Sequence, residues 1–210
     1  MRWRKRRGAR TTAADLTFKY ERLATTGVID QTLSILNSGS SAVALRLVLV
    51  PLDANGHELE GVTTTTAYGS EAGHHIIPAK FTDIDVLSFD GPGFRDVTGV
   101  RVDVQEVLPV PFAAKVREVV LTDRIDGAGN VVPPGYMYEF VRLTNISREA
   151  VTVRVALIEY EEPVPGQSQQ FVDVQPLGDL VEVPARGTTI IPGPSHFPDA
   201  FVSVKAYYSR

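Results

Sequence analysis

Hydrophobic and polar residues alternate with a period of two in two similar stretches of the chain, residues 37–50 and 145–158. The first reads NSGSSAVALRLVLV and the second NISREAVTVRVALI, so one pattern occurs twice, 108 positions apart. Each stretch places four aliphatic side chains on one face, and these are Val43, Leu45, Leu47 and Leu49 in the first and Val151, Val153, Val155 and Leu157 in the second. Such alternation is typical of a half-buried antiparallel strand. We therefore predict that each stretch is a central strand of a β core.

The repeat continues beyond these strands. Pro78-Ala79-Lys80 matches Pro184-Ala185-Arg186 at an offset of 106, and the valines of 100–104 match 202–206 at an offset of 102. The falling offset means that the first copy holds two and then four extra residues between shared landmarks. Insertions of this size belong in loops.

Short β-favouring runs follow one another from Leu16 onward, separated by Gly, Pro, Asn and Asp about every 8 to 12 residues. This spacing predicts a β-sandwich or barrel. Asn37 and Asn145 precede the long strands, where asparagine tolerates a left-handed backbone and bonds its own main chain. Only Thr11–Tyr20 suggests a short helix.

The landmarks LxNxSxxAVxVxVxL, PA[KR] and a closing VxV resemble the tandem immunoglobulin-like β-sandwich repeats of bacterial surface proteins and phage virion proteins. The resemblance spans residues 16–209 and implies a structural or binding role, but it assigns a function to no residue. The cysteine pair and core tryptophan of antibody domains are missing, because the chain has no cysteine and its one tryptophan is Trp3.

The predicted fold is therefore all-β, with two tandem immunoglobulin-like antiparallel β-sandwiches and an extended basic N-terminal arm. We predict four segments along the chain, which are an arm at 1–15, a first sandwich at 16–106, a proline-containing linker at 107–115 and a second sandwich at 116–210. A length of 210 residues allows two cores of ordinary domain size. The hydrophobic fraction of 43% and charged fraction of 22% are globular values and argue against wholesale disorder.

Charge is distributed unevenly along the chain. The net charge is −4, but residues 1–10 hold six of the 21 basic residues and no acidic one, which leaves 15 basic and 25 acidic residues, a net of −10, in residues 11–210. No apolar run is long enough to span a membrane, and the arm lacks the apolar segment of a signal peptide. The sequence therefore predicts no transmembrane segment and no export by the standard secretory route.

The arm is the predicted partner-binding site. Its candidate residues are Arg2, Trp3, Arg4, Lys5, Arg6, Arg7 and Arg10. The acidic bodies of other protein subunits, in a homo- or hetero-oligomeric assembly, would complement this charge. Nucleic-acid phosphates with the indole stacked on a base, an anionic membrane surface, and a solvated tail stay open as alternatives.

His74 and His75, with His57, Asp83 and Asp85 nearby in the sequence, form the one group with metal-ligand chemistry. Adjacent residues on a strand point to opposite faces, so the two histidines would share an ion only in a loop. No HExxH or similar spacing is present. We predict a polar loop between strands, with no metal and no cofactor.

Other chemical motifs are weak. The stretches 53–56 (DANG) and 126–130 (DGAGN) offer oxygens to calcium, but 53–56 lacks the EF-hand glycine position, and both are predicted as hairpin turns in which Asn and Gly adopt positive φ. The stretch 69–73 (GSEAG) has its serine one place too early for a hydrolase GxSxG elbow, and the chain has no P-loop and no GxGxxG unit. A carboxylate pair acting on sugars stays open, because 25 acidic residues always allow one.

Four tyrosines of the second copy, Tyr136, Tyr138, Tyr207 and Tyr208, suit either an exposed interface or the core and rim of a sandwich. We favour core or rim.

The sequence thus predicts a non-catalytic structural or assembly protein, a component of a virion or similar supramolecular complex that contacts other proteins through loops and the arm. The alternative is a cell-surface adhesion or carbohydrate-binding module, and an enzyme would need a pocket around His57, His74 or His75. The predicted location is a virion or assembly, otherwise the bacterial cytoplasm or cell surface. Functional differences should lie where the copies differ, at residues 55–75 and 82–99, at the tyrosines and in the arm.

Overall fold

The computed structural model describes residues 11–22, 31–110, 118–133, 135–160, 162, 171–194 and 201–210. These residues form an all-β protein, as predicted, and every strand pairing among them is antiparallel. The helical elements in this part of the chain are two 3-10 turns, Ala13–Asp15 and Phe94–Asp96.

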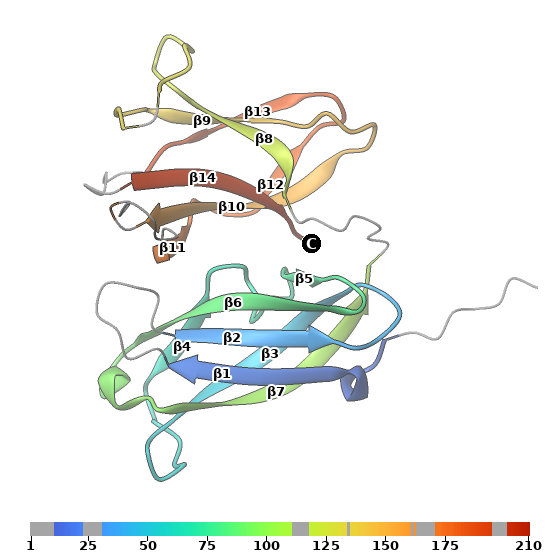
Figure 1. Cartoon of the computed structure of the whole chain (residues 1–210), viewed down its shortest axis with the longest axis vertical. Coiled ribbons are helices and arrows are strands. Elements are labelled where there is room, and N and C mark those ends of the chain that lie inside the picture. Colours follow the sequence, from blue (N-terminus) through green and yellow to red (C-terminus); the bar gives the residue numbers. More distant parts are fainter. Residues whose placement is uncertain are drawn as a thin grey trace, which may run out of the picture.

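The first half of the chain forms two sheets (Figure 1). One has the order β1-β2-β6-β4 and the other the order β5-β3-β7. The strands are β1 (Leu16–Arg22), β2 (Gln31–Asn37), β3 (Val43–Leu52), β4 (Thr63–Thr66), β5 (Ile76–Ile77), β6 (Phe81–Asp90) and β7 (Gly99–Pro109).

The second half forms a seven-stranded sheet with the order β11-β10-β14-β8-β9-β13, in which β12 also pairs with β10. The strands are β8 (Glu118–Ile125), β9 (Phe140–Thr144), β10 (Val151–Tyr160), β11 (Phe171–Pro176), β12 (Val181–Val183), β13 (Thr188–Pro192) and β14 (Phe201–Tyr208). The beginning of β8 pairs with β14, and from Leu121 onward β8 pairs with β9. This change of partner folds the sheet into two layers.

Each half has its own apolar core between its layers, centred on the predicted strands. The four alternating side chains of β3 are between 0 and 8% exposed, and those of β10 between 0 and 9%. Burial of each such side chain stabilises the fold by about 1.5–3 kcal/mol. Arg46 lies on the opposite, exposed face of β3, as predicted. The core predictions for β3 and β10 are therefore confirmed.

Two local predictions are corrected. Thr11–Tyr20 is not a helix, because the 3-10 turn covers only three residues and β1 follows from Leu16. Leu16, Phe18 and Tyr20 alternate toward the core, a strand period that outweighs the weak helical preference. At the linker, β7 continues to Pro109, which pairs with Val43 of β3. Residues 111–115 of the linker lie outside the described residues.

Asn37 and Asn145 form the same buried network in both halves. Asn37 Nδ2 donates to the carbonyls of Ser41, Ile77 and Pro78 at 2.9, 3.2 and 3.1 Å, and its Oδ1 accepts from Gly39 N at 2.9 Å. Asn145 repeats these four bonds, with Nδ2 donating to Glu149, Val183 and Pro184 and Oδ1 accepting from Ser147 N. We call these two residues the asparagine clamps. Each clamp ties its turn to the Pro-Ala-basic segment.

The left-handed backbone expected at these asparagines lies elsewhere. It occurs at the matching residues Lys80 and Arg186, with φ of 57° and 52°. In each copy the asparagine forms the hydrogen bonds, whereas the left-handed backbone occurs at the basic residue. The two properties expected of asparagine therefore belong to two different matching positions of the repeat.

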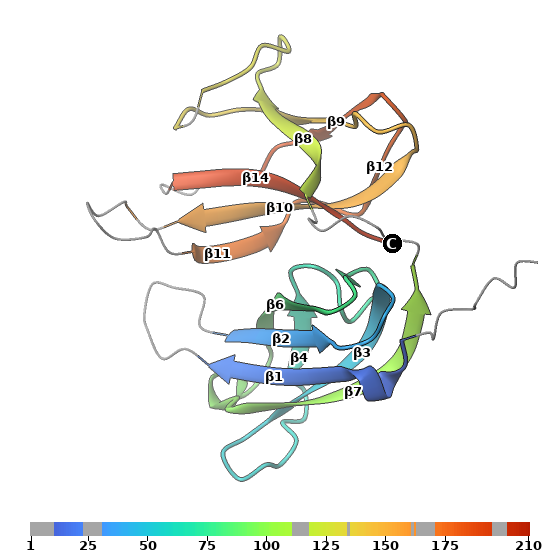
Figure 2. The same cartoon turned by 45° about the vertical axis from the view of Figure 1, so that its right-hand side comes forward.

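The two halves pack against each other through one face of the second half (Figures 1 and 2). Ala156 and Ile158 are buried on the face of β10 that points away from its own core. With Val174 of β11 they join Ala67 and Tyr68 of the first half in a third apolar cluster. A smaller cluster joins Tyr208 to β3 and β5. Both faces of β10 are therefore buried, one in the core and one at this interface.

Candidate functional site

The predicted partner-binding residues of the arm lie outside the described residues. These are Arg2, Trp3, Arg4, Lys5, Arg6, Arg7 and Arg10. The described chain begins at Thr11, whose amide donates to Ser41 Oγ at 3.1 Å and whose Oγ1 donates to the Ser41 carbonyl at 2.8 Å. A Cβ on Gly39 would lie 2.2 Å from Thr11 Oγ1, so the glycine makes room for this contact. The root of the arm is thus fixed on the first half.

The structure separates the three histidines that the sequence offered as candidate metal ligands. His57 is exposed, with Nδ1 3.5 Å from Asp53 Oδ2. His74 Nδ1 lies 2.5 Å from the carbonyl oxygen of Arg210. His75 instead points inward and is 1% exposed. The described residues contain no group of three or more ligand side chains arranged to hold a metal ion.

His75 belongs to a buried polar cluster with Ser70, Asp83 and Asp85, which we call the His75 cluster. Its Nδ1 lies 2.9 Å from Ser70 Oγ and 3.3 Å from Asp85 Oδ2, and its Nε2 lies 3.3 Å from Asp83 Oδ2. Both imidazole nitrogens thus face acceptors, which fits a protonated imidazolium. The side chains of Asp83 and Asp85 thus lie at the two nitrogens of one buried imidazole.

Burial acts to raise the pKa of Asp85, but the opposing effects are larger. Hydrogen bonding to His75, the charge of His75, and hydrogen bonds from Ser70 Oγ and Tyr68 N–H together hold the pKa of Asp85 below its usual value. Asp85 is therefore ionised within the protein, as a buried charge with several partners can be.

The Ser70, His75 and Asp85 side chains do not have the geometry of a nucleophilic triad. A triad places the serine and the carboxylate on opposite imidazole nitrogens and opens the serine to substrate. Here Ser70 Oγ donates to Asp85 Oδ2 at 2.5 Å, both groups lie at Nδ1, and Ser70 is fully buried. These hydrogen bonds fix the buried Ser70 side chain and do not expose its hydroxyl as a nucleophile.

The His75 cluster supports the contact between the halves. Tyr68 packs on the His75 ring at 5.5 Å on one side and edge-on against Tyr207 of the second half at 5.1 Å on the other. Next to it, Ser209 Oγ donates to the His74 carbonyl at 3.1 Å. Tyr68, His74 and His75 belong to the region 55–75, where the two copies differ. This region therefore forms part of the interface between the halves.

The stretches 53–56 and 126–130, whose oxygens could suit calcium, are turns, as predicted. Asp53 Oδ1 accepts from the amides of Asn55 and His57, and Gly56 has φ of 80°. The stretch 126–130 repeats this arrangement, with Asp126 as acceptor and a left-handed glycine. In both turns the glycine supplies the positive φ, and the aspartate oxygen is occupied by main-chain amides.

The tyrosines of the second copy divide between core, interface and surface. Tyr138 is 4% exposed and its ring lies 5.7 Å from the Arg124 guanidinium. Tyr207 and Tyr208 are half-buried at the interface between halves. Tyr136 is 69% exposed. The core or rim interpretation therefore holds for Tyr138, whereas Tyr136 is available for contacts.

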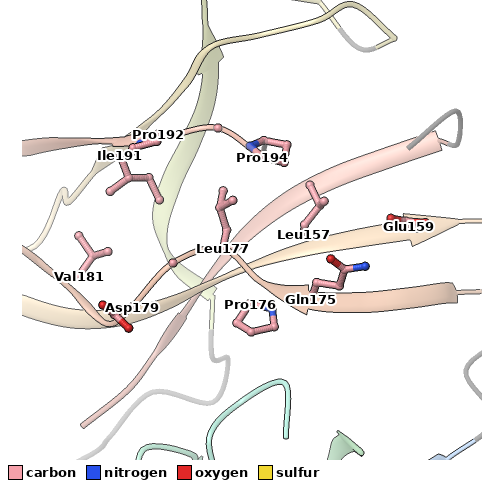
Figure 3. A pocket seen from close by; sticks show the side chains of 12 residues that line it. Leu157, Glu159, Gln175, Pro176, Leu177, Asp179, Val181, Ile191, Pro192 and Pro194 are labelled. Atoms are coloured by element: carbon pink, nitrogen blue, oxygen red, sulfur yellow. The ribbon is translucent and has the colours of Figure 1, made fainter. Parts of the chain in front are cut away.

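A pocket of about 520 Å³ opens in the second half between β10, β11 and β13 (Figure 3). In Figure 3, Ile191, Pro192 and Pro194 line one side and face Leu157 and Leu177 across the opening. The remaining lining residues are Glu159, Gln175, Pro176, Gly178, Asp179, Val181 and Gly193. The floor is apolar and carboxylates lie at its rim. We call this the β11 pocket.

A difference between the copies explains the pocket. In the first half, β4 follows β3 in the chain and pairs with β6, at the end of the four-stranded sheet. In the second half, β11 follows β10 but pairs with β10 itself, in the other layer. Among the described residues, β13 pairs only with β9. No described strand therefore occupies the space beside β13 that corresponds to β4.

Negative charge gathers at one side of the β11 pocket. Glu159 of β10 lies directly opposite Asp173 of β11 in the antiparallel register, an arrangement of like charges that is unfavourable. Burial and then the charge of Asp173 raise the pKa of Glu159. Within the described residues, neither carboxylate forms an ion pair with a lysine or arginine.

Sequence reasoning did not identify the His75 cluster as buried or the β11 pocket as open. The sequence signal for the pocket is the unusual run Ile191-Pro192-Gly193-Pro194, which ends β13 after five residues, whereas β6 runs for ten. No helix among the described residues is long and apolar enough to cross a bilayer. Comparison of the chain with protein-family models, curated proteins and solved structures found no match.

Proposed function

We propose that the chain is a non-catalytic structural subunit of a larger assembly, built from two tandem immunoglobulin-like sandwiches. In this proposal it contacts neighbouring protein subunits through its arm and loops, in a virion or similar supramolecular complex. Contacts between copies of the same chain are the version that its charge distribution favours, because a basic arm and an acidic body complement each other.

The observation behind this proposal is the packing of the two halves. The apolar cluster around Tyr68 and Tyr207 and the buried His75 cluster beneath it join the halves at one face. Domains that move freely usually meet through smaller and more polar contacts. Packing between the halves would fix the position of Thr11, where the arm begins, relative to the β11 pocket. A constant geometry of this kind suits a subunit that repeats in an assembly.

A second candidate is a carbohydrate-binding or adhesion module, and the loop between β8 and β9 favours it. Val131, Tyr136 and Met137 are 60, 69 and 77% exposed there. Exposed aromatic and apolar side chains at a loop tip can stack on sugars or on a protein surface. Replacement of Tyr136 by Ala would abolish glycan binding under this candidate and would leave arm-dependent assembly intact under the first.

The native mass of the purified chain tests the main proposal. We expect the full chain, with a subunit mass of 22.9 kDa, to form larger species in sedimentation velocity as its concentration rises at physiological salt. A variant lacking residues 1–10 should stay monomeric. The deletion must end before Thr11, because Thr11 belongs to the folded body.

A full chain that stays monomeric up to its solubility limit would contradict self-assembly. Equal association of the full chain and the deletion variant would contradict the role of the arm. Circular dichroism of the deletion variant provides the folding control.

A further inference from the structure

The β11 pocket is the part of the second half that its own described strands leave open. Its counterpart in the first half is occupied by β4, which pairs with β6. The apolar side chains of Leu157, Leu177 and Ile191 line the opening (Figure 3). Apolar surface arranged in this way gains free energy when another apolar group covers it.

The edge of β13 favours entry by a side chain over addition of a strand. Pro192 and Pro194 have no amide hydrogen, so they cannot donate to an added strand, and prolines are a common device that blunts sheet edges. Gly193 N already donates to the Glu139 carbonyl at 2.8 Å. A large flat side chain can instead pack against the two proline rings.

The charge at the rim selects a cationic occupant. Glu159 and Asp173 face each other without a cation from the described residues, and Asp179 adds a third carboxylate at the rim. Burial and the neighbouring charge of Asp173 raise the pKa of Glu159, because both disfavour its ionised form. An arginine or lysine placed here would relieve that repulsion.

We infer that the β11 pocket of one copy binds the N-terminal arm of a second copy, with Trp3 against the apolar floor and the flanking basic residues beside Glu159 and Asp173. This inference rests on the proposed function. The arm supplies one large aromatic side chain among six basic ones, and tryptophan and arginine are both enriched among the residues that contribute most to binding at protein interfaces.

The start of β1 and the end of β10 lie on opposite sides of the body (Figures 1 and 2), so the occupant that we propose is the arm of another copy. In both views β1 begins on the right, whereas β10 ends on the left near the pocket (Figures 1 and 2). Thr11 is fixed at the start of β1, and ten extended residues reach at most about 35 Å. A contact from arm to pocket is heterologous, so copies join head to tail into chains or closed rings.

The sole tryptophan provides the readout, because its emission reports the surroundings of the arm in the full chain. We expect Trp3 emission to shift to shorter wavelength as the protein concentration rises, in parallel with the increase in mass. Higher salt should reverse both changes, since salt screens the attraction between the basic arm and the partly exposed carboxylates of the rim.

Two variants test the pocket itself. The double variant Glu159→Gln and Asp173→Asn removes the rim charge, and Gln175→Phe narrows the opening at an exposed position. Each should weaken self-association about tenfold or more. The matched control, Glu60→Gln with Asp90→Asn, removes two exposed carboxylates from the first half and should leave association unchanged.

Loss of folding does not explain the expected result. Removal of the Glu159 charge relieves repulsion, so the double variant should melt at an equal or higher temperature than the parent at neutral pH while it associates less. If the pocket contributed only to stability, the double variant would lower the melting temperature and the association together.

Three results would overturn the inference. One is a Trp3 shift that is independent of concentration at monomer mass, which indicates binding within one copy. Another is a shift that appears only when a single-stranded oligonucleotide is added. The third is association that depends on the arm but survives both pocket variants, in which case the proposed function stands and its acceptor lies elsewhere.

Discussion

The asparagine clamps offer the clearest test of how the duplicated framework is stabilised. We consider Asn37→Ala in the first half and Asn145→Ala in the second. Both side chains are at most 1% exposed, and each change removes one amide that bonds its own turn and the Pro-Ala-basic segment.

The structure sets the size of the effect. Each asparagine makes four hydrogen bonds, three through Nδ2 and one through Oδ1. At a net contribution of about 0.5–1.5 kcal/mol per bond, either substitution should lower the free energy of unfolding by about 2–6 kcal/mol. Asn37→Asp should cost at least as much, because a carboxylate cannot donate and would face three carbonyl oxygens.

Chemical denaturation followed by far-ultraviolet circular dichroism measures these changes. Trp3, the sole tryptophan, belongs to the arm and to neither predicted sandwich, so its fluorescence is not the probe that we choose. Gln105→Ala, an exposed position on β7, is the control and should change stability by no more than about 0.5 kcal/mol.

The reasoning would be refuted by losses below about 1 kcal/mol for both alanine variants. It would also fail if Asn37→Asp were as stable as the parent, because the aspartate keeps the acceptor and removes only the donor.

Other expectations follow from the same structure. Arg186→Gly should raise the free energy of unfolding by about 0.5–1 kcal/mol, because the left-handed backbone strains arginine by more than glycine costs in backbone entropy. Lys80→Gly should give a smaller gain, because it also removes the bond from Lys80 Nζ to the Ser38 carbonyl. Asp85 has a lowered pKa, so its contribution is present above the unfolded carboxyl pKa and is lost as pH falls through the folded pKa. Asp85→Asn should therefore weaken the protein at neutral pH and flatten the loss of stability in acid, as measured by denaturation from pH 7 to about pH 3. Tyr207→Ala should uncouple the halves, and calorimetry should then show two transitions where the parent shows one.

The sequence was sufficient to place the strands whose two faces differ in polarity. The valines and leucines of β3 and β10 alternate because one face meets a core, and that periodicity is a local property of the chain. The pairing partner of β11 is not local. A strand with one buried face fits either layer of a two-layer fold, so the sequence could not show that β11 lies on β10 while β4 lies on β6.

The candidate sites were harder to predict for a related reason. His74 and His75 are adjacent and chemically identical, yet one meets the carbonyl of Arg210 and the other enters a buried cluster. His75 meets Asp85 inside the fold and packs through Tyr68 against Tyr207 of the second half, and the latter contact is remote in sequence. The pocket likewise lies where no described strand pairs with the free edge of β13, and this depends on where β11 pairs, which the local pattern of residues does not encode.

The contact between Thr11 and Ser41 has a mechanical consequence. The Ser41 carbonyl accepts from both Thr11 Oγ1 and Asn37 Nδ2, so tension on the arm enters the body at the carbonyl that the clamp also holds. From there it spreads to Ile77 and Pro78 through the same amide. A pull on the arm would therefore load the Thr11 contact and the clamp bonds together before it reaches the pairing of β1 with β2.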